Sequence, residues 1–322
     1  MKKFFLIYLL LLVCFSVKGQ VEKIILPSDL KQQTVVTEPV TLRKGYLRAE
    51  TNITFSASDK GFNDSSKKEY YIGSSWGSRY QFNFNLQYGI SDRMEIDVYI
   101  PFVNKRNDYY FVSRMPVANQ DASISSDLRG RAIGDCSLFF RYQVIPEKEK
   151  RTSLSIFSEI SFPTGPKNPT DIKDFNDYHL PTGTGHYSAG LWLYANWVHY
   201  PYSYTIIGNY YYNFRGSKRM SADDAVETKF KNGNMARLGG RFNCHLNEWI
   251  VLVNEISGFY YSKGEENNGT VVSINPAWEI DYVPRLVFQV RRFRIVEFVE
   301  VPLIGKDIGA DPIYSLSAGY TF

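Results

Sequence analysis

The 322-residue sequence has few cysteines, no long apolar run beyond its N-terminus and little net charge. Three cysteines do not indicate a disulfide framework. No other stretch approaches 18 uninterrupted apolar residues, and the mean hydropathy is -0.28, which argues against a bundle of membrane-spanning helices. The formal charge of +4 comes from scattered basic residues, so we expect no nucleic-acid partner.

Motifs for catalytic, metal or cofactor chemistry are also absent from the sequence. The histidines have no metal-ligand spacing and no accompanying Gly-x-Ser-x-Gly motif; they are His179, His186, His199 and His245. Paired acids such as Glu95 and Asp97 favour glycosidase chemistry only when a second acid lies across the substrate, and the sequence places none there. We therefore expect no cofactor, no metal and no enzyme activity.

The first 19 residues have the pattern of a secretory signal peptide. Two lysines precede a short apolar run over 4–15, and small residues follow, ending at Gly19. The run is too short to remain in a membrane as a helix. We expect cleavage between Gly19 and Gln20 and export from the cytoplasm; lipidation of Cys14 is the alternative.

Alternation of apolar and polar residues is the main pattern of the remaining chain. In 80–102, YQFNFNLQYGISDRMEIDVYIPF, apolar and polar residues take turns on both sides of Ser91–Asp92. A period of two predicts strands, and two such runs across a short turn predict an antiparallel hairpin. Similar runs give twelve expected strands: 45–56, 79–90, 93–102, 134–145, 152–162, 186–198, 203–215, 234–246, 248–261, 270–282, 285–301 and 313–322.

The connections between these strands alternate between long and short. A soluble β-sandwich has no reason to gather its long loops at one end, whereas outer-membrane barrels have short periplasmic turns and long extracellular loops. We therefore predict an all-β fold, a transmembrane antiparallel β-barrel of about 12 strands over 45–322. Residues 20–44 form a periplasmic or lumenal extension, and the expected location is the outer membrane of a Gram-negative bacterium.

Two strands near the C-terminus carry additional signals. In 285–301 the apolar phase slips at Arg291–Arg292 and again near Glu297, which a β-bulge or an interrupted strand explains. The last strand ends on Phe322 and resembles the signal read by the barrel-insertion machinery. We expect that machinery, outer-membrane lipid and a small-molecule solute as partners.

The polar faces of the strands should line the barrel interior, where a passing solute would meet them. The predicted lining residues are Gln81, Asn83, Asn85, Gln87, Glu95, Asp97, Arg141, Glu159, Arg237, Arg241, Glu255, Glu279, Asp281 and Arg291. These side chains either select solutes or fill a narrow lumen with ion pairs and hydrogen bonds, and the sequence leaves both readings open.

Several stretches together resemble the outer-membrane transporter family named for the meta-pathway of phenol degradation, a distant relative of the long-chain fatty-acid transporters. They are LQYGISDRMEIDVYIPF (86–102), IGDCSLFFRYQV (133–144), SEISFPTG (158–165), EPVTLRKGYLRAE (38–50) and the stretch 302–305 before the last strand. The resemblance implies facilitated diffusion of small, apolar or aromatic molecules. The fatty-acid relatives use an N-terminal plug, whereas residues 20–44 suffice only for a short lumen insert.

Alternative functions are a barrel lipid hydrolase using His186 and Ser188, a closed structural barrel, and a secreted soluble β-sandwich. The barrel hypothesis predicts that deletion of Phe322 impairs assembly, because the insertion machinery reads the terminal aromatic strand. Fractionation of cells expressing the full-length and truncated chains measures this. Recovery of both chains in the soluble fraction without detergent, with no effect of the deletion, would favour the sandwich.

Overall fold

The computed structural model describes residues 41–58, 60–63, 65–70, 76–114, 121–146, 151–168, 180–219, 226–247, 249–267 and 271–322. The expected signal peptide, its cleavage site and most of the expected extension lie outside these ranges. Within them, every regular element is a strand. No described helix is long and apolar enough to cross a membrane.

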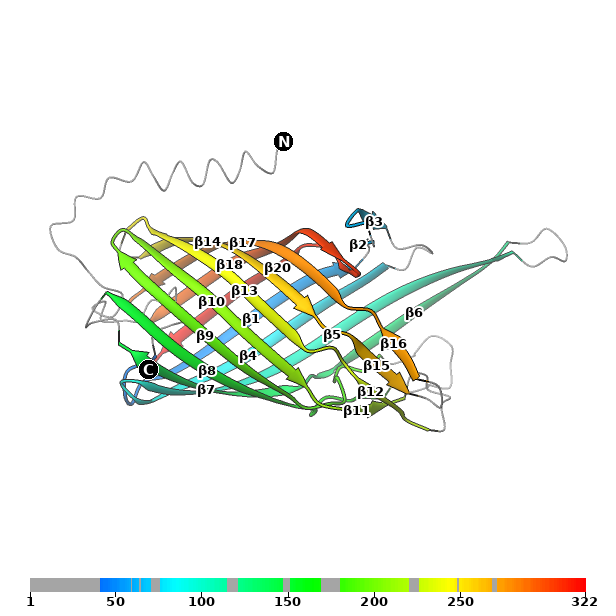
Figure 1. The fold of residues 1–322 in the computed structure, drawn as a ribbon, viewed down its shortest axis with the longest axis horizontal. Helices are drawn as coiled ribbons and strands as arrows, with labels where there is room; N and C mark the ends of the chain where they lie inside the picture. Colours follow the sequence, from blue (N-terminus) through cyan, green and yellow to red (C-terminus); the bar gives the residue numbers. More distant parts are fainter. Residues whose placement is uncertain are drawn as a thin grey trace.

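Twelve antiparallel strands close into a barrel, which confirms the predicted fold class (Figure 1). Strands adjacent around the barrel pair antiparallel, and β1 pairs with both β4 and β20, which closes the sheet. The barrel strands are β1 (Leu47–Ser58), β4 (Trp76–Ser91), β5 (Met94–Arg114), β7 (Cys136–Ile145), β8 (Thr152–Phe162), β9 (Ser188–His199), β10 (Tyr202–Asn213), β13 (Met235–His245), β14 (Ile250–Tyr261), β17 (Ala277–Val290), β18 (Phe293–Lys306) and β20 (Ile313–Thr321).

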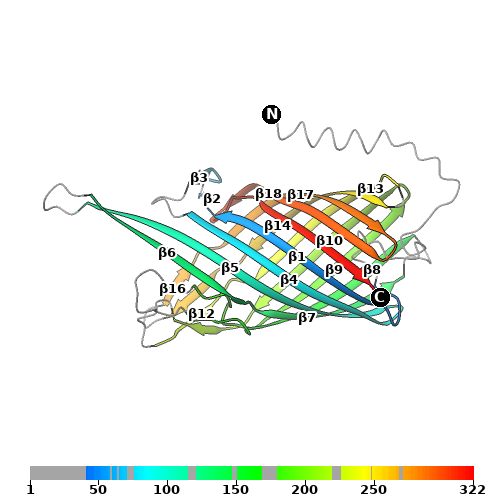
Figure 2. The ribbon, with the colours of Figure 1, turned by 180° about the vertical axis from the view of Figure 1, so that it is seen from behind.

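The two ends of the barrel differ, as the loop lengths predicted. At one end β5 continues beyond the barrel and pairs with β6 (Asp121–Ile133) to form a projecting arm (Figures 1 and 2). Two small sheets extend the wall at the same end: β11 (Gly216–Lys218), β12 (Thr228–Lys231), β15 (Gly264–Asn267) and β16 (Val271–Ile274), and β19 (Ile308–Gly309), β2 (Lys60–Phe62) and β3 (Lys68–Tyr70). The opposite end carries short turns and the C-terminus (Figure 2). We call these the loop end and the turn end.

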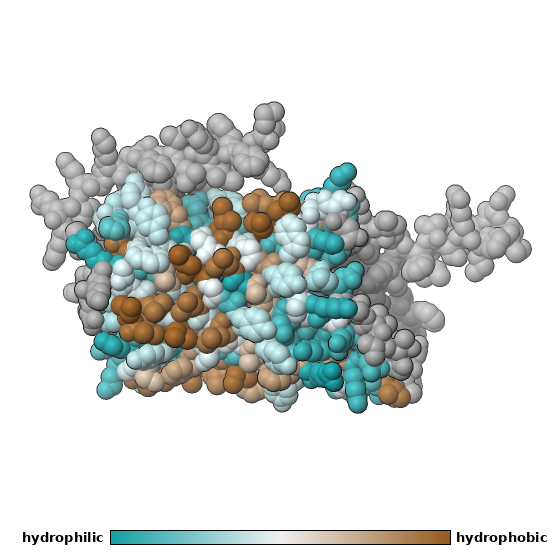
Figure 3. All heavy atoms as spheres, viewed as in Figure 1, coloured by the Kyte–Doolittle hydropathy of each residue, from teal (hydrophilic) through white to brown (hydrophobic). Residues whose placement is uncertain are grey.

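The hairpin 80–102 illustrates how the sequence pattern becomes two faces of the wall. Tyr80 and Phe82 on its apolar face are exposed on the outside, whereas Asn83 and Gln87 on its polar face are buried inside the barrel. The same outward exposure of large apolar side chains recurs around the barrel, and Figure 3 shows them as brown areas on one side of the wall. A sheet that is apolar outside and polar inside is the surface that lipid requires.

The predicted boundary between the strands 270–282 and 285–301 is wrong. Strand β17 runs through Val283 and Pro284, and the chain turns at Arg291–Arg292, where Arg291 has a positive φ of 52°. Proline lacks the N–H that a ladder hydrogen bond needs, so a proline in the sequence usually indicates the end of a strand. Here the β17–β18 register skips Val283 and Pro284, so the wall tolerates the proline without ending the strand. The phase slip is thus an interruption by a turn.

Cysteine labelling tests this register in a background with Cys136 and Cys244 replaced by alanine. We expect Arg292→Cys to react with a maleimide in the folded, detergent-solubilised protein, because Arg292 is exposed in the turn. We expect Val283→Cys to remain unreactive until the barrel is unfolded, because Val283 is buried. Equal labelling of both positions in the folded protein would contradict the turn at Arg291–Arg292 and support the one predicted at 283–284.

Candidate functional site

The barrel interior is the candidate functional site, because it collects nearly all predicted lining residues. The inward-facing ones are Gln81, Asn83, Asn85, Gln87, Glu95, Asp97, Arg141, Glu159, Arg237, Arg241, Glu255, Glu279 and Asp281. Arg291 is the exception. It lies exposed in the β17–β18 turn, because β17 ends at Val290, one residue before it. Whether the others contact a solute stays a prediction.

A buried glutamate with three arginines forms the strongest polar contact inside. Glu255 on β14 is fully buried and accepts hydrogen bonds from the guanidinium groups of Arg237, Arg241 and Arg285. Its Oε2 lies 2.8 Å from both Arg241 Nη2 and Arg285 Nη2. Charge-assisted hydrogen bonds offset the cost of burying this carboxylate, so the cluster ties three neighbouring strands together across the inner wall.

A second cluster lies on β5 and β7, where Arg141 faces two acids. Its guanidinium nitrogens lie 3.5 Å from Glu95 Oε1 and 3.6 Å from Asp97 Oδ2. All three side chains are almost completely buried. The alternation that places Glu95 and Asp97 on one face of β5 therefore serves a shared cation on the neighbouring strand, and this arrangement accounts for the acid pair without catalysis.

The chain before β1 enters the turn end of the barrel and contacts this second cluster. The backbone N–H of Leu42 donates to Glu95 Oε2, and Thr41 Oγ1 donates to the Asp92 carbonyl at 3.1 Å. Both residues are buried, at 3% and 1% exposure. At Gly89 there is no room for a side chain, because a Cβ would lie 2.1 Å from the Arg43 carbonyl oxygen. Residues 41–46 therefore narrow the lumen at this end.

Uncharged polar groups connect the inner faces of β1, β4 and β5. Gln81 Nε2 donates to Asn83 Oδ1 at 2.6 Å and lies 2.8 Å from Tyr99 Oη. Asn83 Nδ2 in turn donates to Asn52 Oδ1 at 3.0 Å. These amides form an uncharged, hydrogen-bonded part of the inner wall, in contrast to the two clusters of charged residues.

Aromatic side chains inside the barrel are the feature that sequence reasoning missed. Phe157, Trp192 and Tyr194 point inward, and the Trp192 and Tyr194 rings stack with centroids 6.1 Å apart. Strand alternation identifies them by parity, since Trp192 and Tyr194 share a face with buried Asn196. The expectation that aromatics face lipid concealed them.

Arginines lie over these inward rings, in a row that crosses the strands. The Arg141 guanidinium lies 4.0 Å from the Phe157 ring centroid, and that of Arg237 lies 5.9 Å from Trp192 and 5.0 Å from Phe259. The strand register aligns these residues across β7, β8, β9, β13 and β14. A cation over an aromatic face is attracted by the partial negative charge that the quadrupole of the neutral ring places on that face, and burial strengthens the attraction. We call these residues the arginine–aromatic row.

The described residues provide no catalytic arrangement of the kind the enzyme alternative needs. His186 lies at the loop end with Nε2 3.3 Å from Asn213 Oδ1 and Nδ1 3.5 Å from the Thr184 carbonyl, so its polar contacts do not include Ser188. Among the same residues, no group of three His, Cys, Asp or Glu side chains is arranged to hold a metal ion.

Loops at the loop end are held by carboxylates. Asp135 accepts hydrogen bonds from the backbone N–H groups of Gly165 and Thr184, at 3.1 and 2.7 Å, which ties two loops together. Above them Glu227 accepts a hydrogen bond from Lys167 Nζ at 2.7 Å. Hydrogen bonds from Lys167, Ser217 and Asn168 lower the pKa of Glu227 to about 2. Glu227 is therefore charged at any physiological pH.

Comparison with solved structures gives the fold a second line of support. No protein-family model and no curated protein matches the sequence. The chain superposes on an outer membrane channel from Pseudomonas putida F1 with a TM-score of 0.68 and 12% sequence identity, covering 89% of this chain and 98% of that one. A deletion mutant of TodX, a monoaromatic hydrocarbon channel, gives a TM-score of 0.50 and 8% identity over 89% and 92%. At these identities the likeness concerns the fold, a barrel of the outer-membrane type.

The Glu255 cluster leads to a stability prediction. Glu255→Gln removes the negative charge and leaves three arginines facing one another, so we expect the free energy of unfolding to fall by about 3–5 kcal/mol. Guanidinium-induced unfolding in detergent, followed by the gel mobility of the folded barrel, measures the change. Glu297→Gln, the same substitution at an exposed position on the outer wall, should change stability by less than about 0.5 kcal/mol. Equal stability of both variants would show that the cluster contributes nothing.

Proposed function

We propose that the protein is a passive outer-membrane channel for small, uncharged solutes that carry an aromatic ring. The observation that carries this proposal is the arginine–aromatic row, in which the partly exposed rings of Trp192 and Phe259 and the guanidinium of Arg237 lie together inside a closed barrel. Aromatic rings stack on aromatic side chains and on guanidinium planes, so such a solute binds weakly at several successive positions. Weak, repeated binding permits passage without an energy source.

The charge pattern of the interior supports an uncharged solute. The arginines of the clusters face carboxylates within the wall, as Arg141 does with Glu95 and Asp97, and Arg294 with Glu50 at 2.6 Å. The Glu255 cluster has an excess of arginines and the Arg141 cluster has an excess of acids, so the interior presents no continuous field of one sign that would select ions. Ion conduction through the barrel is therefore secondary to the passage of neutral molecules.

The resemblance to the phenol meta-pathway transporters fits the same proposal, as does the fold shared with channel proteins. In this proposal the signal peptide exports the chain, and the terminal strand directs its insertion into the outer membrane. Phe322 is exposed, and its ring lies 4.9 Å from that of Tyr320 on the outer wall. A closed structural barrel is the second candidate, favoured by the segment 41–46 at the turn end, where Thr41 and Leu42 are buried.

Swelling of liposomes that contain the purified protein tests the proposal with two neutral sugars, phenyl glucoside and the smaller methyl glucoside. In a simple sieve the smaller solute enters faster. We expect phenyl glucoside to enter at least as fast, because its ring binds the arginine–aromatic row. Trp192→Leu should restore the order set by size.

Trp197→Leu is the matched control, because Trp197 lies on the same strand but faces outward. It should leave the solute order of the wild type unchanged. Entry in order of size in the wild-type protein would contradict the aromatic preference. Absence of both swelling and conductance in planar bilayers would contradict the channel and favour the closed barrel.

A further inference from the structure

A basic patch lies on the outer wall at the loop end, away from the interior. Arg215 follows β10, and Lys229 and Lys231 lie on β12, whose alternate residues Thr228 and Phe230 are buried. Alternation along β12 therefore turns both lysines to the same outward face. Figure 3 shows hydrophilic residues gathered at this end of the molecule, beyond the apolar band.

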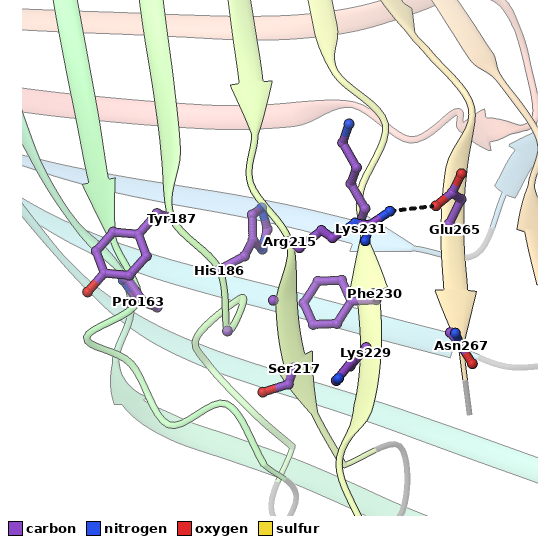
Figure 4. A pocket seen from close by; sticks show the side chains of 12 residues that line it. Pro163, His186, Tyr187, Arg215, Ser217, Lys229, Phe230, Lys231, Glu265 and Asn267 are labelled. Atoms are coloured by element: carbon purple, nitrogen blue, oxygen red, sulfur yellow. Dashed lines mark ion pairs between the residues drawn. The ribbon is translucent and has the colours of Figure 1, made fainter. Parts of the chain in front are cut away.

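The patch borders a cavity of about 510 Å³ that Figure 4 shows from close by. Tyr187 and Pro163 form one side of it, and Arg215, Lys229 and Lys231 form the other. The volume accommodates a sugar-sized or phosphate-bearing headgroup. Because these three cations line the same side of one cavity, an anionic group beside them would meet several donors at once.

The positive charge of the patch is only slightly neutralised by the protein. Among the described residues the patch has one ion pair, between Arg215 and Glu265 at 3.7 Å, and both side chains are largely exposed. An exposed pair at this distance contributes little, so Arg215 is available to another anion. No described carboxylate pairs with Lys229 or Lys231. Lys229 and Lys231 lie on the same face of β12, where like charges repel, and a bound anion would reduce that repulsion.

The patch directly borders an aromatic belt on the lipid-facing wall. Lys231 Nζ lies 5.0 Å from the ring centroid of Tyr212, whose ring packs edge-on against Phe214. Tyr187, which lines the cavity, packs edge-on against Phe162. Aromatic rings in outward positions mark the level of the membrane interface, so the cations above them lie at the level of the lipid headgroups.

We propose that this patch binds the phosphate of a phosphorylated glycolipid in the outer leaflet, of the lipid A type. The phosphate lies between Arg215, Lys229 and Lys231, and the acyl chains run down over Tyr187 and Tyr212. The assignment rests on the proposed orientation, with the loop end outside the cell, and is independent of what passes through the interior.

Native mass spectrometry of the detergent-purified full-length protein tests the proposal with bisphosphorylated and dephosphorylated lipid A. We expect the bisphosphorylated lipid to bind, and its Kd to rise by about tenfold or more in the triple variant Arg215→Ser, Lys229→Ser, Lys231→Ser, since each cation near a headgroup contributes about 1 kcal/mol. A control variant, Lys44→Ser, Arg291→Asn, Arg292→Ser, removes the same charge from exposed positions at the turn end and should bind as the wild type does.

Equal binding of the dephosphorylated lipid, or unchanged binding by the triple variant, would overturn the proposal. Inorganic phosphate at millimolar concentration distinguishes a lipid headgroup from free phosphate as the ligand. Full displacement of the lipid by phosphate would show that the patch is a general phosphate site and would contradict the lipid proposal. Gel mobility of the folded barrel confirms that each variant is folded. Liposome swelling should be the same for the triple variant and the wild type, so failure here and failure of the channel proposal are separate results.

Discussion

The pairing of β1 with both β4 and β20 is the constraint on which the remaining structure depends. Lipid offers no hydrogen bonds, so a sheet in a bilayer must leave no strand edge unpaired. Closure fixes the period of two, because every second side chain must face lipid and the others must face inward. The clustered acids and arginines of the barrel strands, such as Glu255 and Arg241, therefore lie in the interior, where they find partners on their own or a neighbouring strand.

The interior solves this requirement in an uneven way. Charges gather in clusters, such as that of Glu255, while neutral amides and aromatic rings occupy the wall between them. Near the turn end, valines on β14, β17 and β18 also face inward and pack together. The lumen is thus neither a uniformly polar pore nor a packed core. In the proposed channel a solute would meet ring faces, amides and paired charges, and for this reason we propose that ring recognition determines the selectivity.

Much of the fold was accessible from the sequence, because alternation is a strong local signal. The hairpin at 80–102 and ten of the strands followed from it, and the loop lengths predicted that the two ends of the barrel differ. Alternation failed at Pro284, because a residue that usually ends strands lies within one here. As a result Arg291 was wrongly predicted to line the interior, and the inward-facing Arg285 and Arg294 were not predicted. The site was less accessible, because which partner an arginine finds depends on strand register across the sheet, and no single strand contains that information. Trp192 was missed because composition places aromatics at the lipid interface and only parity places this one inside.

The close approach at Gly89 links two parts of the chain that are distant in sequence. The Arg43 carbonyl occupies the position that a side chain at 89 would take. Any side chain larger than hydrogen at 89 is incompatible with the segment 41–46 lying where it does. Selection therefore acts on these positions as one unit: homologous barrels that keep the segment in place should keep glycine here, and barrels that have lost it are free to vary. A residue other than glycine at the position of Gly89 in a related sequence would therefore indicate that the inner segment is displaced or absent in that barrel.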